Sequence, residues 1–164
     1  MERSVVSGAG DDATGAPGLR VSNGSFVQGG GWSISGFPVG VCLQPSSEVA
    51  SGATGDAQTA GPRLRLEPNS MLFGNGVGVY ADTGADVRLA GVWVQNSGHA
   101  GLVSHSRSTV VSRSVIRGTR GRSRLSLSGS GIYVSDDSVR RKELLVDRGI
   151  SPGHRPGALH FGRS

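Results

Sequence analysis

Residues 75–104 read NGVGVYADTGADVRLAGVWVQNSGHAGLVS. This stretch contains the pattern Gly–apolar–any–apolar-or-small twice, as Gly78-Val-Tyr-Ala81 and as Gly101-Leu-Val-Ser104, with the two glycines 23 residues apart. Residues 77–81 alternate with period two, which is typical of a strand with one buried face. Gly, Asn and Asp separate the short runs that are rich in Val and Leu, so the stretch predicts β-strands joined by turns.

The same pattern recurs along the chain. Its six copies begin at Gly18, Gly40, Gly78, Gly101, Gly131 and, most weakly, Gly157. The gaps between these glycines are 22, 38, 23, 30 and 26 residues, so a period of 22–23 is interrupted by longer insertions. Two predicted loop insertions account for the longest gaps, the low-complexity stretch 45–62 and the Arg-rich stretch 117–130. Such a period with loops of variable length is typical of a solenoid.

Each repeat offers further apolar strands after its glycine. Eight or nine residues after a glycine lie Val87, Val110 and Val139, and about five residues beyond them lie the segments 92–94, 114–116 and 144–146. We therefore expect three short strands in every repeat. One repeat alone cannot bury its apolar face, whereas about five stacked coils, roughly 4.8 Å apart, form one continuous core.

Three corner segments carry a family resemblance. They are Asn96-Ser-Gly-His-Ala-Gly101-Leu-Val-Ser, Asn75-Gly-Val-Gly78-Val-Tyr and Ser114-Val-Ile-Arg-Gly118. Together with the period, they resemble the right-handed parallel β-helix repeats of the pectin lyase-like superfamily. The resemblance implies an all-β right-handed parallel β-helix of about five coils over residues 1–146. Residues 147–164 are expected to form an irregular basic tail or an incomplete last coil, and the chain to be a fragment or a short member of the family.

Composition narrows the classes of function. Of 164 residues 28 are Gly and 24 are Ser, while 35% are hydrophobic and 5% aromatic. No apolar run approaches the roughly 18 residues of a transmembrane helix, so no membrane insertion is expected. The single cysteine, Cys42, excludes an intrachain disulfide and a Cys-based zinc cluster. His99, His154 and His160 have no partner at metal-ligand spacing, so no metal is expected. No cofactor is expected either.

The net charge of +5 is unevenly distributed along the chain. Residues 1–104 carry a net charge of −3 and residues 105–164 a net charge of +8. The densest basic stretch contains Arg117, Arg120, Arg122 and Arg124. Arginine suits phosphate, sulfate and carboxylate groups, so these four are candidate ligand-binding residues, with a solvated loop as the alternative. Nucleic acid is not an expected partner, because no aromatic residues are interleaved with them.

In a strand that begins with the repeated glycine, the third and fifth positions are expected to face outward and to stack in rows. The third-position row is Arg20, Cys42, Tyr80, Val103, Tyr133 and Leu159. Tyr80 and Tyr133 lie two coils apart, roughly 10 Å, and could provide stacking platforms for successive sugar rings. The alternative is that these aromatic residues serve the stability of the sheet.

The fifth-position row is Ser22, Gln44, Asp82, His105, Ser135 and Phe161. It places Asp82, His105 and Ser135 on successive coils, with Asp136 next to Ser135. A carboxylate, an imidazole and a hydroxyl together have the composition of an activated nucleophile, and a His flanked by acids could act as a general base. An ordinary polar row on a solvated strand edge has the same composition.

The resemblance implies polysaccharide lyases, glycoside hydrolases and epimerases, but only Asp136-Asp137 matches a family motif, the paired Asp. The sequence therefore favours a non-catalytic scaffold or surface-binding module that binds glycans, located outside the cell or at its surface. The alternative is a carbohydrate-active enzyme that acts on acidic polysaccharide around Asp82, His105 and Asp136. The expected partners are a polysaccharide, another protein, or a second copy joined end to end through uncapped coils.

Overall fold

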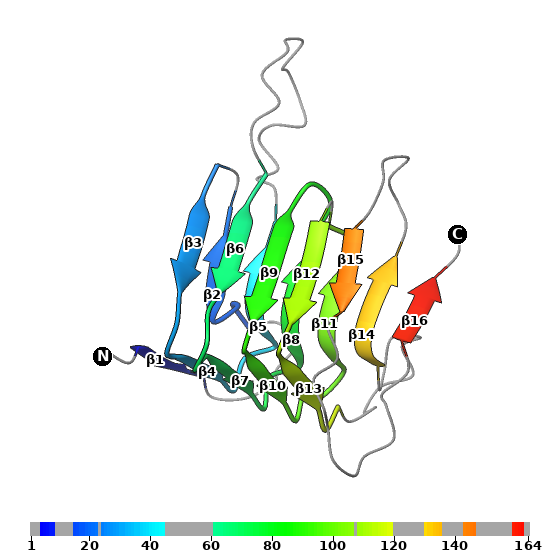
Figure 1. The fold of residues 1–164 in the computed structure, drawn as a ribbon. Helices are drawn as coiled ribbons and strands as arrows, with labels where there is room; N and C mark the ends of the chain where they lie inside the picture. Colours follow the sequence, from blue (N-terminus) through cyan, green and yellow to red (C-terminus); the bar gives the residue numbers. More distant parts are fainter. Residues whose placement is uncertain are drawn as a thin grey trace.

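The chain is all-β in the computed structural model, which describes residues 4–8, 15–22, 24–44, 61–106, 108–119, 130–135, 143–146 and 159–162. None of these residues is helical. The abundance of Gly and Ser is one reason, because both disfavour helix interiors. The strands form three parallel sheets, and Figure 1 shows the strands of each sheet side by side along the molecule.

We name the sheets A, B and C. Sheet A has the order β1-β4-β7-β10-β13, with β1 at Ser4–Ser7, β4 at Trp32–Ser35, β7 at Met71–Phe73, β10 at Trp93–Gln95 and β13 at Val115–Arg117. Sheet B has the order β16-β14-β11-β8-β5-β2, with β2 at Leu19–Val21, β5 at Val39–Leu43, β8 at Val77–Ala81, β11 at Ala100–Ser104, β14 at Ser130–Ser135 and β16 at Leu159–Gly162. Sheet C has the order β15-β12-β9-β6-β3, with β3 at Phe26–Gly29, β6 at Arg63–Leu66, β9 at Asp86–Ala90, β12 at Ser108–Ser112 and β15 at Glu143–Val146.

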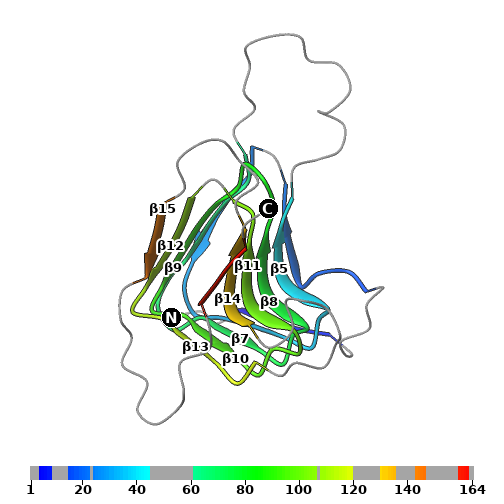
Figure 2. The same ribbon diagram turned by 90° about the vertical axis from the view of Figure 1, so that its right-hand side faces the viewer.

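The chain visits the three sheets in a repeating cycle. β8 of sheet B leads to β9 of sheet C and β10 of sheet A, and β11 then pairs with β8 in sheet B. The strand pairings in the described part of the chain are all parallel. In Figure 2 the sheets form three sides of a roughly triangular cross-section. The stack of parallel sheets is consistent with the predicted solenoid.

The hydrophobic core fills the space between the three sheets. Strand alternation produces it: in β6, Arg63 and Arg65 are exposed, whereas Leu64 and Leu66 are each 1% exposed. Inward residues of neighbouring strands lie in register, as Val41, Val79 and Leu102 do in sheet B. Full burial of one such side chain contributes about 1.5–3 kcal/mol, so the stacked rows hold the sheets together.

The repeated glycine of sheet B marks a place where two sheets approach closely. A Cβ atom at Gly78 would contact the Gly101 carbonyl oxygen and Val94 Cγ1 of sheet A. A Cβ at Gly101 would in turn contact Ile116 Cγ2 and lie 2.6 Å from the Gly131 carbonyl oxygen. The repeated glycine therefore marks a row of positions at which the stacked backbones leave no room for a side chain.

The structure corrects the expected place of the segment 144–146. We expected it to match 92–94 and 114–116, but β15 pairs with β12 in sheet C, with Leu144 opposite Thr109. The reason is the longer connection before it, residues 136–142, compared with residues 105–107 in the preceding turn of the chain. The spacing from the repeated glycine therefore predicted the wrong sheet for this segment.

The expected equivalence of Val87 and Val110 is wrong by one residue. Val87 pairs with Thr109, while Val110 pairs with Arg88 on the outer face. The turn from β11 to β12 is one residue shorter than the turn from β8 to β9, and a one-residue change moves a side chain to the other face. Val139 and the larger part of the loop insertions 45–62 and 117–130, namely residues 45–60 and 120–129, lie outside the described residues.

Candidate functional site

The outer face of sheet B carries the predicted row of third-position residues. Strand register places Arg20, Cys42, Tyr80, Val103 and Tyr133 in line across five strands. The last member is wrong, because Tyr133 pairs with His160 rather than with Leu159. This register aligns Leu159 with Ile132 and Phe161 with Val134. Phe161 therefore also leaves the predicted fifth-position row.

Two members of this outward row are buried. Cys42 is 5% exposed and Val103 is 2% exposed, although neither belongs to the hydrophobic core between the sheets. Their larger neighbours in the row, Arg20, Tyr80 and Tyr133, flank them in the strand register. The outer face of sheet B is thus a packed surface and not a simple solvated row.

Three rings form the centre of this surface, and we call Tyr80, His105 and Tyr133 the Tyr–His–Tyr ladder. The ring centroids of Tyr80 and His105 are 5.8 Å apart at 55°, and those of His105 and Tyr133 are 6.2 Å apart at 62°. Both distances lie in the range of favourable tilted aromatic contacts. The sequence predicts His105 in the other row, but its ring lies between the two tyrosines of the third-position row.

Burial and neighbouring charge tune the groups beside the ladder. The pKa of the Tyr80 phenol is raised by burial, then by the nearby Asp82 carboxylate and by Cys42. The pKa of the Cys42 thiol is raised mainly by burial; Arg20 opposes this and Asp82 adds to it. At neutral pH, Tyr80 therefore keeps its phenolic proton as a hydrogen-bond donor, and Cys42 is a poor nucleophile.

The suggested catalytic group is only partly within the described chain. Asp82 Oδ1 accepts a hydrogen bond of 2.7 Å from the Thr83 backbone N–H, and the Ala85 N–H donates to the Asp82 carbonyl oxygen at 3.2 Å. Asp82 thus shapes the turn between β8 and β9. Ser135 ends β14, but its side chain and Asp136 lie outside the described parts, so the proximity of all four candidates stays a prediction.

A buried hydroxyl cluster that sequence analysis missed holds the chain on both sides of His105. Ser104 Oγ lies 2.5 Å from Ser106 Oγ and 2.7 Å from Thr109 Oγ1, and Ser106 Oγ lies 2.6 Å from Thr109 Oγ1. The Ser106 N–H also donates to Ser104 Oγ at 3.2 Å. These groups are nearly inaccessible, so their mutual hydrogen bonds replace those lost to water. One signal in the sequence could have revealed this cluster. Ser104 is polar at the last position of its repeat, where two other copies have the apolar residues Leu43 and Ala81.

Of the four candidate arginines, the structure describes Arg117. Its guanidinium lies over the Trp93 ring, 5.6 Å from the centroid, and Nη2 donates to Gln95 Oε1 at 3.5 Å on the outer face of sheet A. Arg120, Arg122 and Arg124 lie outside the described residues. Their proposed joint action with Arg117 therefore stays a prediction.

The described residues contain no group of three His, Cys, Asp or Glu that could hold a metal ion. Within the same residues, no helix is long and apolar enough to cross a membrane. Comparison with protein-family models, with curated proteins and with solved structures finds no match to this chain. The fold and the ladder therefore carry the functional argument.

Proposed function

We propose that this protein is a non-catalytic β-solenoid scaffold that binds a glycan along the outer face of sheet B. The observation that carries the proposal is the Tyr–His–Tyr ladder, with its two ring contacts across neighbouring strands of sheet B. Aromatic rings offer large apolar faces with polar tips, which suit the apolar faces and hydroxyl groups of sugars. Tyr80 and Tyr133 are two strands apart, about 10 Å, so the ladder suits an extended chain that runs across the strands.

We also propose that the solenoid is a right-handed parallel β-helix of about five coils, related to the pectin lyase-like superfamily. Strand–crossover–strand connections in parallel sheets are right-handed in nearly all proteins, which supports this hand. The superfamily resemblance rests on the corner segments and the period of the sequence. An extracellular or cell-surface location follows as a further proposal from that resemblance, and end-to-end self-association stays a prediction.

The test is glycan binding by ladder variants. Neutral and acidic polysaccharides are cast in native gels, and retardation of the wild type is compared with Tyr80→Ala and Tyr133→Ala. We expect each variant to bind at least about fivefold more weakly, because each loses one aromatic contact worth about 1 kcal/mol or more. Phe73→Ala is the matched control, since Phe73 is an exposed aromatic residue on sheet A. Equal retardation of all four proteins would overturn the proposal.

The same preparations test for catalysis. Each protein is incubated with pectin, alginate and related uronans, while absorbance of unsaturated products and reducing ends are followed. We expect no turnover from any of them. Turnover by the wild type would overturn the non-catalytic scaffold. Its loss in a further variant, Asp82→Asn, with polysaccharide binding unchanged, would favour the carbohydrate-active enzyme.

A further inference from the structure

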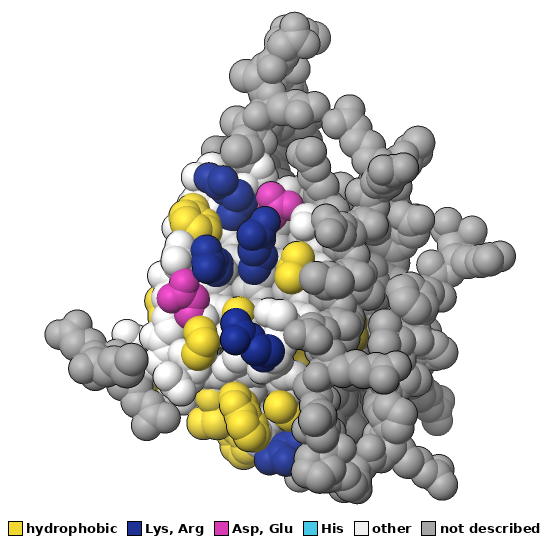
Figure 3. All heavy atoms as spheres, in the orientation of Figure 1, with side chains coloured by type: hydrophobic (Ala, Val, Ile, Leu, Met, Phe, Trp, Pro, Cys, Tyr) yellow, Lys and Arg dark blue, Asp and Glu magenta, His cyan; other side chains and the backbone are white. Residues whose placement is uncertain are grey.

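A second surface, separate from the ladder, carries three clustered arginines on the outer face of sheet C. Arg63 and Arg65 point outward from β6, and Arg88 of β9 lies directly opposite Arg65 in the register. In Figure 3, basic side chains gather on the face where sheet C lies in Figure 1. Like charges directly opposite each other destabilise a sheet, since adjacent strands are only about 4.8 Å apart. We call these three residues the arginine cluster.

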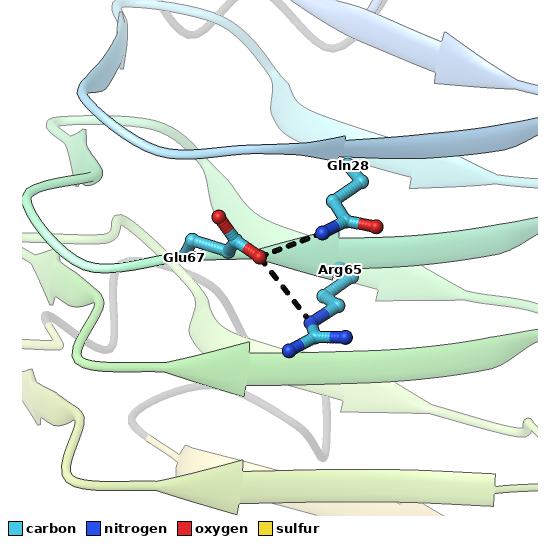
Figure 4. A network of polar contacts seen from close by, with 3 residues as sticks. All are labelled: Gln28, Arg65 and Glu67. Carbon is cyan, nitrogen blue, oxygen red and sulfur yellow. Dashed lines mark hydrogen bonds and ion pairs between the residues drawn. The ribbon is translucent and has the colours of Figure 1, made fainter. Parts of the chain in front are cut away.

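Neighbouring side chains compensate this charge only in part. Figure 4 shows Glu67 Oε1, which accepts a hydrogen bond of 2.7 Å from Gln28 Nε2 and lies 3.5 Å from Arg65 Nε. This ion pair is solvent-exposed and therefore weak. Asp86 is in register with Arg63, yet among the described side chains neither Arg63 nor Arg88 forms an ion pair.

We propose that the arginine cluster binds the sulfate ester groups of a sulfated glycan. A tetrahedral oxyanion presents three oxygens to solvent and can meet three guanidinium groups at once, whereas a carboxylate presents two. When the sulfate binds, it takes the place of Glu67 beside Arg65. It also relieves the repulsion between Arg65 and Arg88, so the bare cluster is a preformed anion site.

The surroundings of the cluster favour a glycan as the carrier of the anion. Glu67, Asp86 and Gln28 offer acceptors that suit sugar hydroxyl groups, whereas the phosphodiester backbone of DNA provides no donors for them. Phe26 is 52% exposed, but the Arg63 guanidinium covers its ring, 5.3 Å from the centroid. The face of the ring turned toward Arg63 is therefore not free to stack a nucleic-acid base. This site lies on a different sheet from the ladder and does not depend on the function proposed there.

The test measures binding of dextran sulfate, unmodified dextran, polygalacturonate and a single-stranded oligonucleotide to the wild type, Arg65→Gln and Arg88→Gln. We expect dextran sulfate to bind best and each variant to bind it about tenfold more weakly, as expected for loss of one charge-assisted hydrogen bond. Arg88→Lys keeps the charge but loses the planar fork, so it should also bind more weakly. Arg20→Gln on sheet B is the charge-matched control and should bind dextran sulfate as the wild type does.

Three outcomes would overturn the proposal. They are wild-type affinity for dextran sulfate in Arg65→Gln and Arg88→Gln, an equal loss in Arg20→Gln, and equal affinity of the wild type for polygalacturonate or the oligonucleotide. Thermal unfolding of each variant shows that it is folded, and we expect the midpoint of Arg88→Gln at low salt to be no lower than that of the wild type. Phe73→Ala on sheet A should retain dextran sulfate binding. Arg65→Gln and Arg88→Gln should bind unmodified dextran as the wild type does, which separates this site from the ladder.

Discussion

Arg113 turns the chain between β12 and β13 with a φ of 47°, a left-handed conformation that disfavours most side chains. Gly91, with a φ of 64°, has the equivalent position between β9 and β10. A hydrogen bond from the Gly91 N–H to the Ser112 carbonyl oxygen links the two corners. Asn96, with a φ of 55°, lies at the corner between β10 and β11. Asn tolerates this left-handed conformation better than most residues. Arg113 is therefore the position at which a glycine would relieve strain.

We predict that Arg113→Gly raises the free energy of unfolding by about 0.5–1 kcal/mol. Relief of left-handed strain gains about 1–2 kcal/mol, and the extra freedom of glycine in the unfolded chain offsets roughly half of it. Urea unfolding followed by circular dichroism measures the change. Gly91→Ala, whose Cβ would lie 3.2 Å from Pro68 Cγ, should lower stability in the same assay. A less stable Arg113→Gly protein would show that the Arg113 side chain contributes more than its backbone strain costs.

At the scale of elements, the strands of sheet B depend on glycine for space rather than for backbone freedom. The inner side of Gly101 faces Ile116 Cγ2 and the Gly131 carbonyl oxygen, so any added atom must push sheet B away from sheet A or from its own next strand. Gly74, by contrast, has a φ of 62° but nothing within 4 Å of an added Cβ. An alanine at Gly101 would therefore suffer from crowding, whereas an alanine at Gly74 would suffer only from its left-handed backbone conformation.

We predict that Gly101→Ala lowers the free energy of unfolding by at least about 2 kcal/mol, because overpacking forces backbone shifts. Gly74→Ala should cost about 1 kcal/mol, the left-handed strain alone. Chemical unfolding of both variants gives the comparison. A cost for Gly101→Ala equal to or below that of Gly74→Ala would contradict the close approach of the two sheets.

At the scale of the whole molecule, stability is a sum over neighbouring strands in three sheets. β8, β9 and β11 have partners on both sides, whereas β2 and β3 are edge strands of sheets B and C. In such a stack each layer is stabilised by the layers beside it, so the ends open more easily than the middle.

Amide hydrogen exchange should follow this gradient. We predict that the paired amides of β8, β9 and β11 exchange at least about tenfold more slowly than those of β2 and β3. Exchange followed by mass spectrometry of peptic fragments resolves these segments. Uniform protection across all five strands would instead indicate that the molecule opens as a single unit.

Much of the fold could be predicted from local pattern. Alternation in residues 77–81 and the spacing of the glycines led to parallel strands in three stacked sheets, and this coarse prediction is confirmed. The row of Arg20, Cys42, Tyr80, Val103 and Tyr133 was predicted with the same register that the strands adopt. These features depend on residues that repeat at regular intervals, and period-two geometry carries them across the sheet.

The remaining features depend on contacts between segments far apart in the chain. Differences in connection length of one to four residues moved Val110 to the outer face and β15 to sheet C, and a register shift brought His160 opposite Tyr133. Side-chain packing then placed the His105 ring against both tyrosines. The sequence by itself determined the repeating strands and their glycines, because these follow from local geometry. Only the tertiary structure decided the Tyr–His–Tyr ladder and the arginine cluster, because loop length and packing set which side chains meet.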